Sequence, residues 1–152
     1  MAMAASVTHA SGREIHKEHE ELERVLARLD AALDRLVYYA EVFADLHTVT
    51  QVRRLGGILT SWFPDHCRRE EELLLEPVAR VSNELDTFSR SMRAEHIELL
   101  ALLSSFRSAL EEYDSGESSP AAVGNLKECG KELVASIRAH VALEERELSG
   151  FL

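Results

Sequence analysis

Four segments of the chain carry apolar residues that recur at alternating spacings of three and four. These segments run from Ile15 to Ala40, from Val52 to Pro77, from Leu85 to Tyr113 and from Leu126 to Phe151. This spacing puts the apolar side chains on one helix face and is typical of the inward seam of a helix bundle. The positions expected on the inward faces include Leu26, Leu59, Leu73, Phe106 and Glu147. The sequence therefore predicts an all-α fold, an up-and-down antiparallel four-helix bundle over residues 12–152. Residues 1–11 are small and polar, and we expect them to form a disordered tail.

Turn and capping residues separate the four segments. Ser82-Asn83 is a turn and N-cap signal, and the stretch 114–120 is a loop in which Pro120 suits the first turn of the next helix. Bundle geometry places the first turn near Val42-Phe43, where no Gly or Pro marks it. Pro64 is expected to kink the second helix or to shift its register.

Each apolar seam also contains one histidine. These are His19, His66, His96 and His140. With only seven His in 152 residues, one on every seam exceeds what chance would place there. In an up-and-down bundle, residues equally far from the turn that joins their helices lie at the same height, and the four histidines satisfy this condition. A single core histidine is commonly a satisfied structural residue, whereas four at one level indicate a shared ligand.

Two of these histidines are followed four residues later by a glutamate, in His66-x-x-x-Glu70 and His140-x-x-x-Glu144. Residues at this spacing share one face of a helix, so both side chains can point at one ion. Four of the seven His have a Glu at this spacing, so the spacing alone is a weak signal. The position on the buried seam strengthens it, because a buried imidazole and carboxylate need a partner that a metal ion supplies.

A weak internal repeat relates the two halves of the chain. Glu18-His19 with Leu22 matches Glu95-His96 with Leu99, and the two His-x-x-x-Glu-Glu stretches match each other, at offsets of 77 and 74 residues. The chain therefore resembles two helix hairpins of common ancestry. A site built by such halves has near two-fold symmetry, which suits two metal ions better than one.

The order His19, His66-x-x-x-Glu70, His96 and His140-x-x-x-Glu144 resembles the hemerythrin-like family, also called the HHE cation-binding domain. The resemblance covers residues 12–152 and implies a four-helix bundle that holds two iron ions with an oxo or hydroxo bridge. It also implies that the four histidines are terminal ligands and that the two glutamates are bridging carboxylates. Imidazole and carboxylate at a two-metal site suit iron or manganese better than a closed tetrahedral zinc site. Of these metals, the resemblance favours iron.

The chain differs from the oxygen-carrying hemerythrins. Leu100 stands where those proteins have a second histidine on the third helix, and Leu74 stands where some bacterial relatives have a tyrosine. The chain thus resembles the simpler bacterial branch with the pattern H–HxxxE–H–HxxxE. Both irons would keep an open position, which favours binding of, or reaction with, dioxygen, hydrogen peroxide or nitric oxide. An iron- or oxygen-sensing module read by a partner protein is the alternative, and turnover of a substrate such as peroxide stays open.

Three further residues could add a ligand, namely His16, His47 and Glu23. His16 lies beside the first seam, and His47 lies about 28 Å along the second helix from that helix's seam histidine. A solvated side chain is the simpler interpretation of Glu23. We expect Glu71 and Glu145, which follow the two seam glutamates, to face solvent.

Charge and cysteine usage limit the partners and the compartment. The net charge of −10 disfavours nucleic acid and anionic membranes as partners. No apolar run approaches the ~18 residues of a membrane span, and the N-terminus lacks the features of a signal peptide. Cys67 and Cys129 form no C-x-x-C motif or disulfide framework, which favours a reducing cytoplasm, and Cys67 is expected to be a packed thiol. The sequence predicts a cytoplasmic protein with a small diatomic or peroxide ligand, and it identifies neither a partner protein nor an oligomeric state.

Overall fold

The computed structural model describes the backbone of residues 2–40, 46–114 and 119–152, and the side chains of residues 9–36, 47–114 and 119–152. The described elements are helical. They are α1 (Ala2–Ala40), α2 (Leu46–Glu70), the π-helical segment η1 (Glu71–Leu75), α3 (Glu76–Ala79), α4 (Asn83–Asp114) and α5 (Pro120–Glu147). The predicted all-α class is therefore confirmed, while the turn expected near Val42-Phe43 lies outside the described residues.

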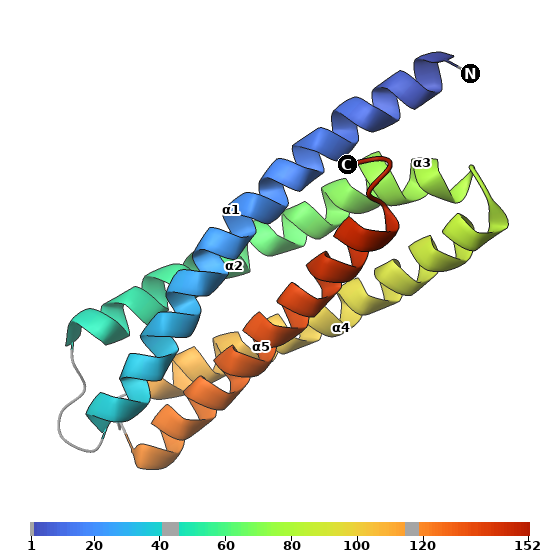
Figure 1. Cartoon of the computed structure of the whole chain (residues 1–152). Coiled ribbons are helices and arrows are strands. Elements are labelled where there is room, and N and C mark those ends of the chain that lie inside the picture. Colours follow the sequence, from blue (N-terminus) through green and yellow to red (C-terminus); the bar gives the residue numbers. More distant parts are fainter. Residues whose placement is uncertain (1, 41–45, 115–118) are drawn as a thin grey trace.

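The long helices lie lengthwise beside one another (Figure 1). Helix α1 packs against α2 and α5, and α4 packs against α5 and α2. Segments α2, η1 and α3 follow one another, and the two chain termini lie at the same end of the molecule. Helix α1 begins at Ala2, within the segment for which the sequence predicts a disordered tail, and its first turns project beyond the other helices in Figure 1.

The apolar core consists of two separate clusters. The larger one contains buried residues of α1, α2, α4 and α5, including Leu26, Phe63 and Phe106. The smaller one lies nearer the chain termini and includes Ile15 of α1 and Met92 of α4. In sequence, the buried histidines lie between the residues of these clusters, so that apolar packing is present on both sides of the polar residues. Burial at about 25 cal/mol per Å² makes these clusters the main source of the bundle's stability.

The π-helical segment shifts the register of the second seam by one residue. Upstream of it the expected positions are buried, and α2 continues through Pro64. Beyond it the expected positions Leu73 and Pro77 are only half-buried, whereas Leu74 and Val78 are completely buried. A π-helical turn takes up more residues than an α-helical turn, so each later side chain is displaced around the helix axis. The register change predicted at Pro64 is thus found after Glu70.

The cap predicted at Ser82-Asn83 is present, and α5 also has a cap at Ser119, within the predicted loop. The Oγ atom of Ser82 accepts a hydrogen bond from the backbone N–H of Leu85 at 3.2 Å, at the start of α4. The Oγ atom of Ser119 accepts one from the N–H of Ala122 at 3.1 Å, with Pro120 in the first turn of α5. These bonds satisfy N–H groups that have no partner within their own helix.

The C-terminal turn closes the end of the bundle against α1. Leu148 is completely buried, whereas Glu147, expected on the seam, is exposed. The backbone N–H of Phe151 donates to the carbonyl of Leu148 at 2.8 Å, and the ring of His9 stacks on that of Phe151. Gly12 permits this contact, because a Cβ there would lie only 1.6 Å from the Phe151 carbonyl oxygen.

We expect Gly12→Ala to lower the free energy of unfolding by about 1–3 kcal/mol, because the added methyl group must displace a backbone carbonyl. Urea unfolding and carboxypeptidase sensitivity of the C-terminus measure the effect. Gly57→Ala is the matched control, since a Cβ there meets nothing within 4 Å. That control should be stabilised by about 0.5–1 kcal/mol. Equal behaviour of the two variants would contradict the packing described for the C-terminal turn.

Candidate metal centre

The six residues that the sequence singles out converge at one level of the bundle. Helices α1 and α4 each supply a histidine, and α2 and α5 each supply a histidine and a glutamate. At most 4 % of each residue is exposed. The six are His19, His66, Glu70, His96, His140 and Glu144.

Glu70 contacts histidines from three helices. Its Oε2 atom lies 3.1 Å from Nε2 of His66 and 3.8 Å from Nε2 of His19. The same oxygen lies 3.8 Å from Nε2 of His96. One carboxylate of α2 thus faces imidazoles of both halves of the chain.

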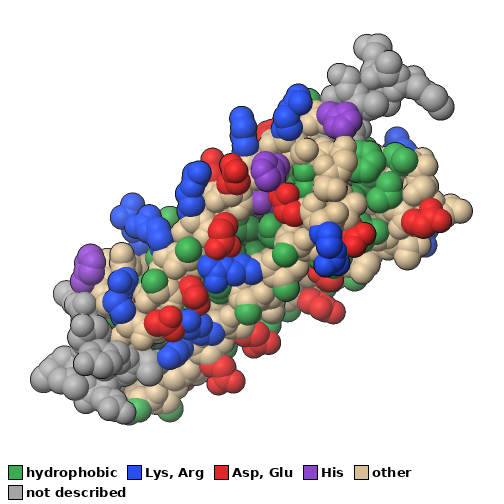
Figure 2. All heavy atoms as spheres, viewed as in Figure 1, with side chains coloured by type: hydrophobic (Ala, Val, Ile, Leu, Met, Phe, Trp, Pro, Cys, Tyr) green, Lys and Arg blue, Asp and Glu red, His purple; other side chains and the backbone are tan. Residues whose placement is uncertain are grey.

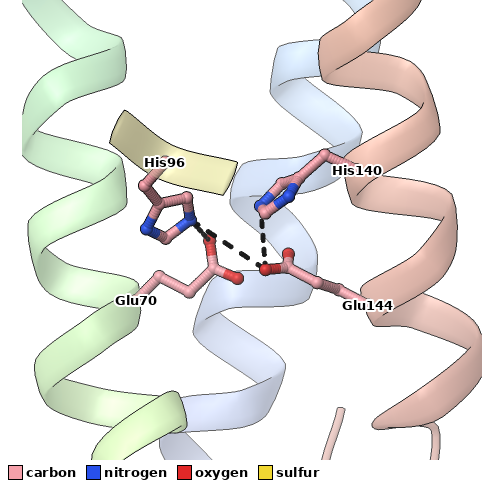
Figure 3. A group of neighbouring side chains, drawn as sticks. All are labelled: Glu70, His96, His140 and Glu144. Carbon is pink, nitrogen blue, oxygen red and sulfur yellow. Dashed lines mark ion pairs between the residues drawn. The ribbon is translucent and has the colours of Figure 1, made fainter. Parts of the chain in front are cut away.

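Glu144 occupies the corresponding position on α5. Its Oε1 atom lies 2.9 Å from Nε2 of His140 and 4.0 Å from Nε2 of His96. Its Oε2 atom lies 3.5 Å from Nε2 of His19. Figure 3 shows Glu70, His96, His140 and Glu144 pointing toward one another from α2, α4 and α5. Two carboxylates that each face imidazoles of both halves have the arrangement that bridging ligands of a metal pair require.

The four imidazoles form two pairs. The ring centroids of His19 and His66 are 5.2 Å apart, and those of His96 and His140 are 4.9 Å apart. Two groups of atoms are close enough to surround an ion, the first pair with Glu70 and the second pair with both glutamates. We name these groups the α1/α2 position and the α4/α5 position. Since Glu70 belongs to both, the geometry fits two adjacent cations.

The inward-facing atoms fit a cation because they face one another without forming hydrogen bonds. Seven of them are buried without a hydrogen bond, namely Nε2 of His19, His96 and His140 and both carboxylate oxygens of Glu70 and Glu144. Burying polar atoms without partners costs about 1–3 kcal/mol each, more when they are charged. Metal ions coordinated by these nitrogens and oxygens would remove that cost, so the residues present fit the group that they are expected to hold.

A second layer of carboxylates holds the outer nitrogen of each imidazole. The Nδ1 atoms of His19, His66, His96 and His140 donate to Glu145, Glu18, Glu71 and Glu95 at 2.8, 2.6, 2.7 and 2.7 Å, respectively. We call these four glutamates the outer carboxylates. A hydrogen bond at Nδ1 fixes the tautomer and leaves Nε2 free to bind a metal.

The outer carboxylates connect the helices in a closed cycle. Glu18 of α1 binds a histidine of α2, and Glu71 of η1 binds one of α4. Glu95 of α4 binds a histidine of α5, and Glu145 of α5 binds one of α1. Each hairpin therefore contains one of these bonds and receives another from the other hairpin.

The expectation that Glu71 and Glu145 face solvent is wrong. Their side chains are 31 % and 30 % exposed, and each is bonded to a histidine of the next helix. A residue directly after a seam position points about 100° away from the seam, which in a bundle is toward the neighbouring helix. The repeated Glu-His and Glu-Glu pairs were the available sequence signal for all four outer carboxylates.

Comparison with known families assigns the chain. The model of the hemerythrin HHE cation-binding domain matches residues 11–152. The chain belongs to the hemerythrin HHE cation-binding family. No curated protein and no solved structure matches it. Family membership and the buried His and Glu groups together indicate a metal-binding helical bundle.

The pKa values of the two inner carboxyl groups of this HHE domain are shifted in opposite directions. Burial raises the pKa of Glu144 well above its ordinary value, and the adjacent charge of Glu70 raises it further. Burial alone would raise the pKa of Glu70 as well, but interactions with Glu144, His19 and His66 hold it well below its usual value. Without metal, Glu144 therefore holds a proton more strongly than Glu70 does, and a bound cation would compete with that proton.

The additional ligand candidates do not join the inner cluster of the HHE domain. His16 contacts Glu145 at 2.9 Å, and Glu23 pairs with Arg138 at 2.8 Å. His47 is exposed near the beginning of α2. Cys67 is a packed thiol, as expected, and burial raises its pKa far above the usual value.

A surface groove between α1 and α5 leads to one of the four inner histidines of the HHE domain. It has a volume of about 590 Å³, and its wall includes His19, His16, Glu145 and the apolar side chains of Leu22 and Val141. Acidic and basic side chains are interspersed over the face in view in Figure 2. Among the described helices, none is long and apolar enough to span a membrane.

Proposed function

We propose that this HHE domain binds two iron ions, bridged by Glu70, Glu144 and an oxo or hydroxo group. The terminal ligands are the Nε2 atoms of His19, His66, His96 and His140. The observation that carries this proposal is the set of seven buried inward-facing atoms without hydrogen-bond partners, in two groups that share a carboxylate. Iron fits the mixture of imidazole and carboxylate and the family to which the chain belongs.

The proposal includes the up-and-down arrangement of the helices and the simpler bacterial pattern of ligands. Placement of one histidine from each long helix at a single level supports the first part. Leu100 and Leu74, at positions where other family members would have further ligands, support the second. Two free cysteines, one of them buried, and the net charge of −10 support a cytoplasmic protein that does not bind nucleic acid.

We infer that the centre binds or reacts with dioxygen, hydrogen peroxide or nitric oxide. When bound, a pair of irons supplies one-electron redox steps and open positions for small ligands. The protein's own contribution is to hold the imidazoles by the outer carboxylates and to exclude bulk water by apolar clusters. Among the described grooves, the one between α1 and α5 reaches His19 and would admit a small ligand.

Metal analysis together with optical spectroscopy tests this function. Purified, iron-supplemented protein should contain about two irons per chain and absorb in the near ultraviolet. Mixing the reduced protein with oxygen or peroxide then separates the possible activities. A stable, reversible oxygen complex without peroxide consumption would indicate a carrier, and iron binding without any turnover would favour the alternative of a sensing module read by a partner.

We expect iron loading to quench the fluorescence of Trp62, which is the only tryptophan of the chain. Its ring stacks on that of His66, with centroids 5.1 Å apart and an interplanar angle of 14°. An iron ion coordinated by this imidazole would lie within energy- and electron-transfer range of the indole. Zinc loading is the control for structural changes, because its filled d shell gives no redox quenching. Equal emission with and without iron would argue against a metal at the α1/α2 position.

A further inference from the structure

The near-symmetric centre has an asymmetric outer layer. Within the described residues, Glu18 forms an ion pair with the guanidinium group of Arg69. Glu145 is shared, because His16 also approaches it, with Nδ1 2.9 Å from Oε1. These two carboxylates accept the Nδ1–H hydrogen bonds of the histidines at the α1/α2 position.

In the described part of the chain, the two carboxylates that accept hydrogen bonds from the histidines at the α4/α5 position have no second charged or hydrogen-bonding partner. Glu71 binds His96 and Glu95 binds His140, and no described Lys or Arg forms an ion pair with either glutamate. Their side chains are 31 % and 35 % exposed, so water screens their charge without neutralising it. The two positions therefore have similar inner ligands and differently compensated outer charges.

This difference changes the donor strength of the imidazoles. A carboxylate that accepts the Nδ1–H bond makes the ligating nitrogen more basic. A cation or a second donor on the same carboxylate makes this increase in basicity smaller, because the carboxylate charge is then shared between two partners. His96 and His140 should accordingly stabilise a more highly charged ion than His19 and His66 do.

We propose that the two metal positions are electronically inequivalent, with the ferric state favoured at the α4/α5 position and the ferrous state at the α1/α2 position. This inference rests on the proposed di-iron function. Its consequence is a stable mixed-valent form. One electron from an external one-electron reductant such as dithionite converts the ferric ion at the α1/α2 position to ferrous, and no bond to the protein is formed or broken.

The groove between α1 and α5 lies on the same side as the more reducible ion. His19 belongs to the α1/α2 position, and it lines that groove together with Glu145. No residue of the α4/α5 histidine pair lines it. A small ligand that enters there would meet the ferrous ion first, so the charge asymmetry and the access route favour the same metal position.

Spectroelectrochemical titration of the iron-loaded full chain tests the proposal, with electron paramagnetic resonance following the mixed-valent state. We expect two separate one-electron steps. Arg69→Gln, which leaves Glu18 uncompensated, should make the first reduction at least tenfold less favourable, equivalent to a potential lower by about 59 mV. Glu95→Gln keeps an acceptor for His140 but removes a charge, so it should make the second reduction easier by a similar factor.

Two variants serve as controls. Arg68→Gln removes the same charge from the adjacent residue, whose partners are Asp65 and Glu72 and not an outer carboxylate. It should leave both steps unchanged, and Arg69→Lys should restore most of the wild-type first step. A single two-electron step, or equal effects of Arg69→Gln and Arg68→Gln, would overturn the proposed inequivalence alone. Fewer than two irons in the wild-type protein would instead refute the di-iron function on which it rests.

Discussion

Glu70→Ala and Glu144→Ala are each expected to abolish binding of both metal ions while the protein remains helical. Each carboxylate faces imidazoles of both metal positions, so its removal would take a ligand from each ion of the proposed centre. The fold should persist, because apolar clusters pack on both sides of the site. In the metal-free protein, the cavity left behind and the relief of a buried carboxyl group oppose each other, so we expect a stability change within about 2 kcal/mol.

Metal content and near-ultraviolet absorption measure the loss of binding, and circular dichroism measures the helical content. Glu98→Ala on α4 is the matched control, because Glu98 is exposed and forms no part of the cluster. It should bind two ions as the wild type does. Retention of the di-iron spectrum in either inner variant would disprove the bridging role, and complete unfolding would show that the carboxylates also hold the scaffold.

Removal of the metal by a chelator is expected to lower the thermal unfolding midpoint by about 8–16 °C. A ligand at 1,000 times its dissociation constant stabilises a folded protein by about 4.1 kcal/mol. For a domain of roughly 150 residues, each kcal/mol corresponds to about 2–4 °C. The physical source is the set of buried nitrogens and oxygens that form no hydrogen bond in the absence of metal.

Differential scanning calorimetry of iron-loaded and chelator-treated protein measures this shift. Glu70→Ala should unfold at the same temperature with and without chelator, because it has no metal to lose. An unchanged midpoint in the wild type would mean that metal does not stabilise these inner atoms, and it would contradict this prediction.

The sequence predicted the seams because helical periodicity is a local property. Expected core positions such as Leu26, Leu59 and Phe106 are buried in the structure. The prediction went wrong where the helix itself changes, since the π-helical segment buries Leu74 in place of Leu73. No residue type marks such a segment reliably, because it results from packing against neighbouring helices and not from local preference.

The inner residues of the candidate site could be predicted from the sequence. The repeated Glu-His and Glu-Glu pairs mark the positions of the outer carboxylates but do not reveal their role. His and Glu on an apolar seam are polar residues at positions where buried apolar residues are expected, so they can be recognised from the sequence as candidate ligands. Glu18 and Glu95 lie beside the seam, where charged residues are ordinary. Their role depends on which helix is the neighbour and how the two are aligned, and only the assembled bundle determines both.

Because the outer carboxylates connect the helices in a cycle, the domain can be divided into two hairpins that complement each other. A single hairpin has one internal bond of this kind and one unmet donor and acceptor, each of which is complemented by the other hairpin. Two copies of one hairpin, related by a dyad axis, would meet both requirements and would present four histidines and two bridging carboxylates. The chain thus resembles a covalently joined pseudo-dimer, in which the two halves can differ in sequence, as they do at Arg69 and His16.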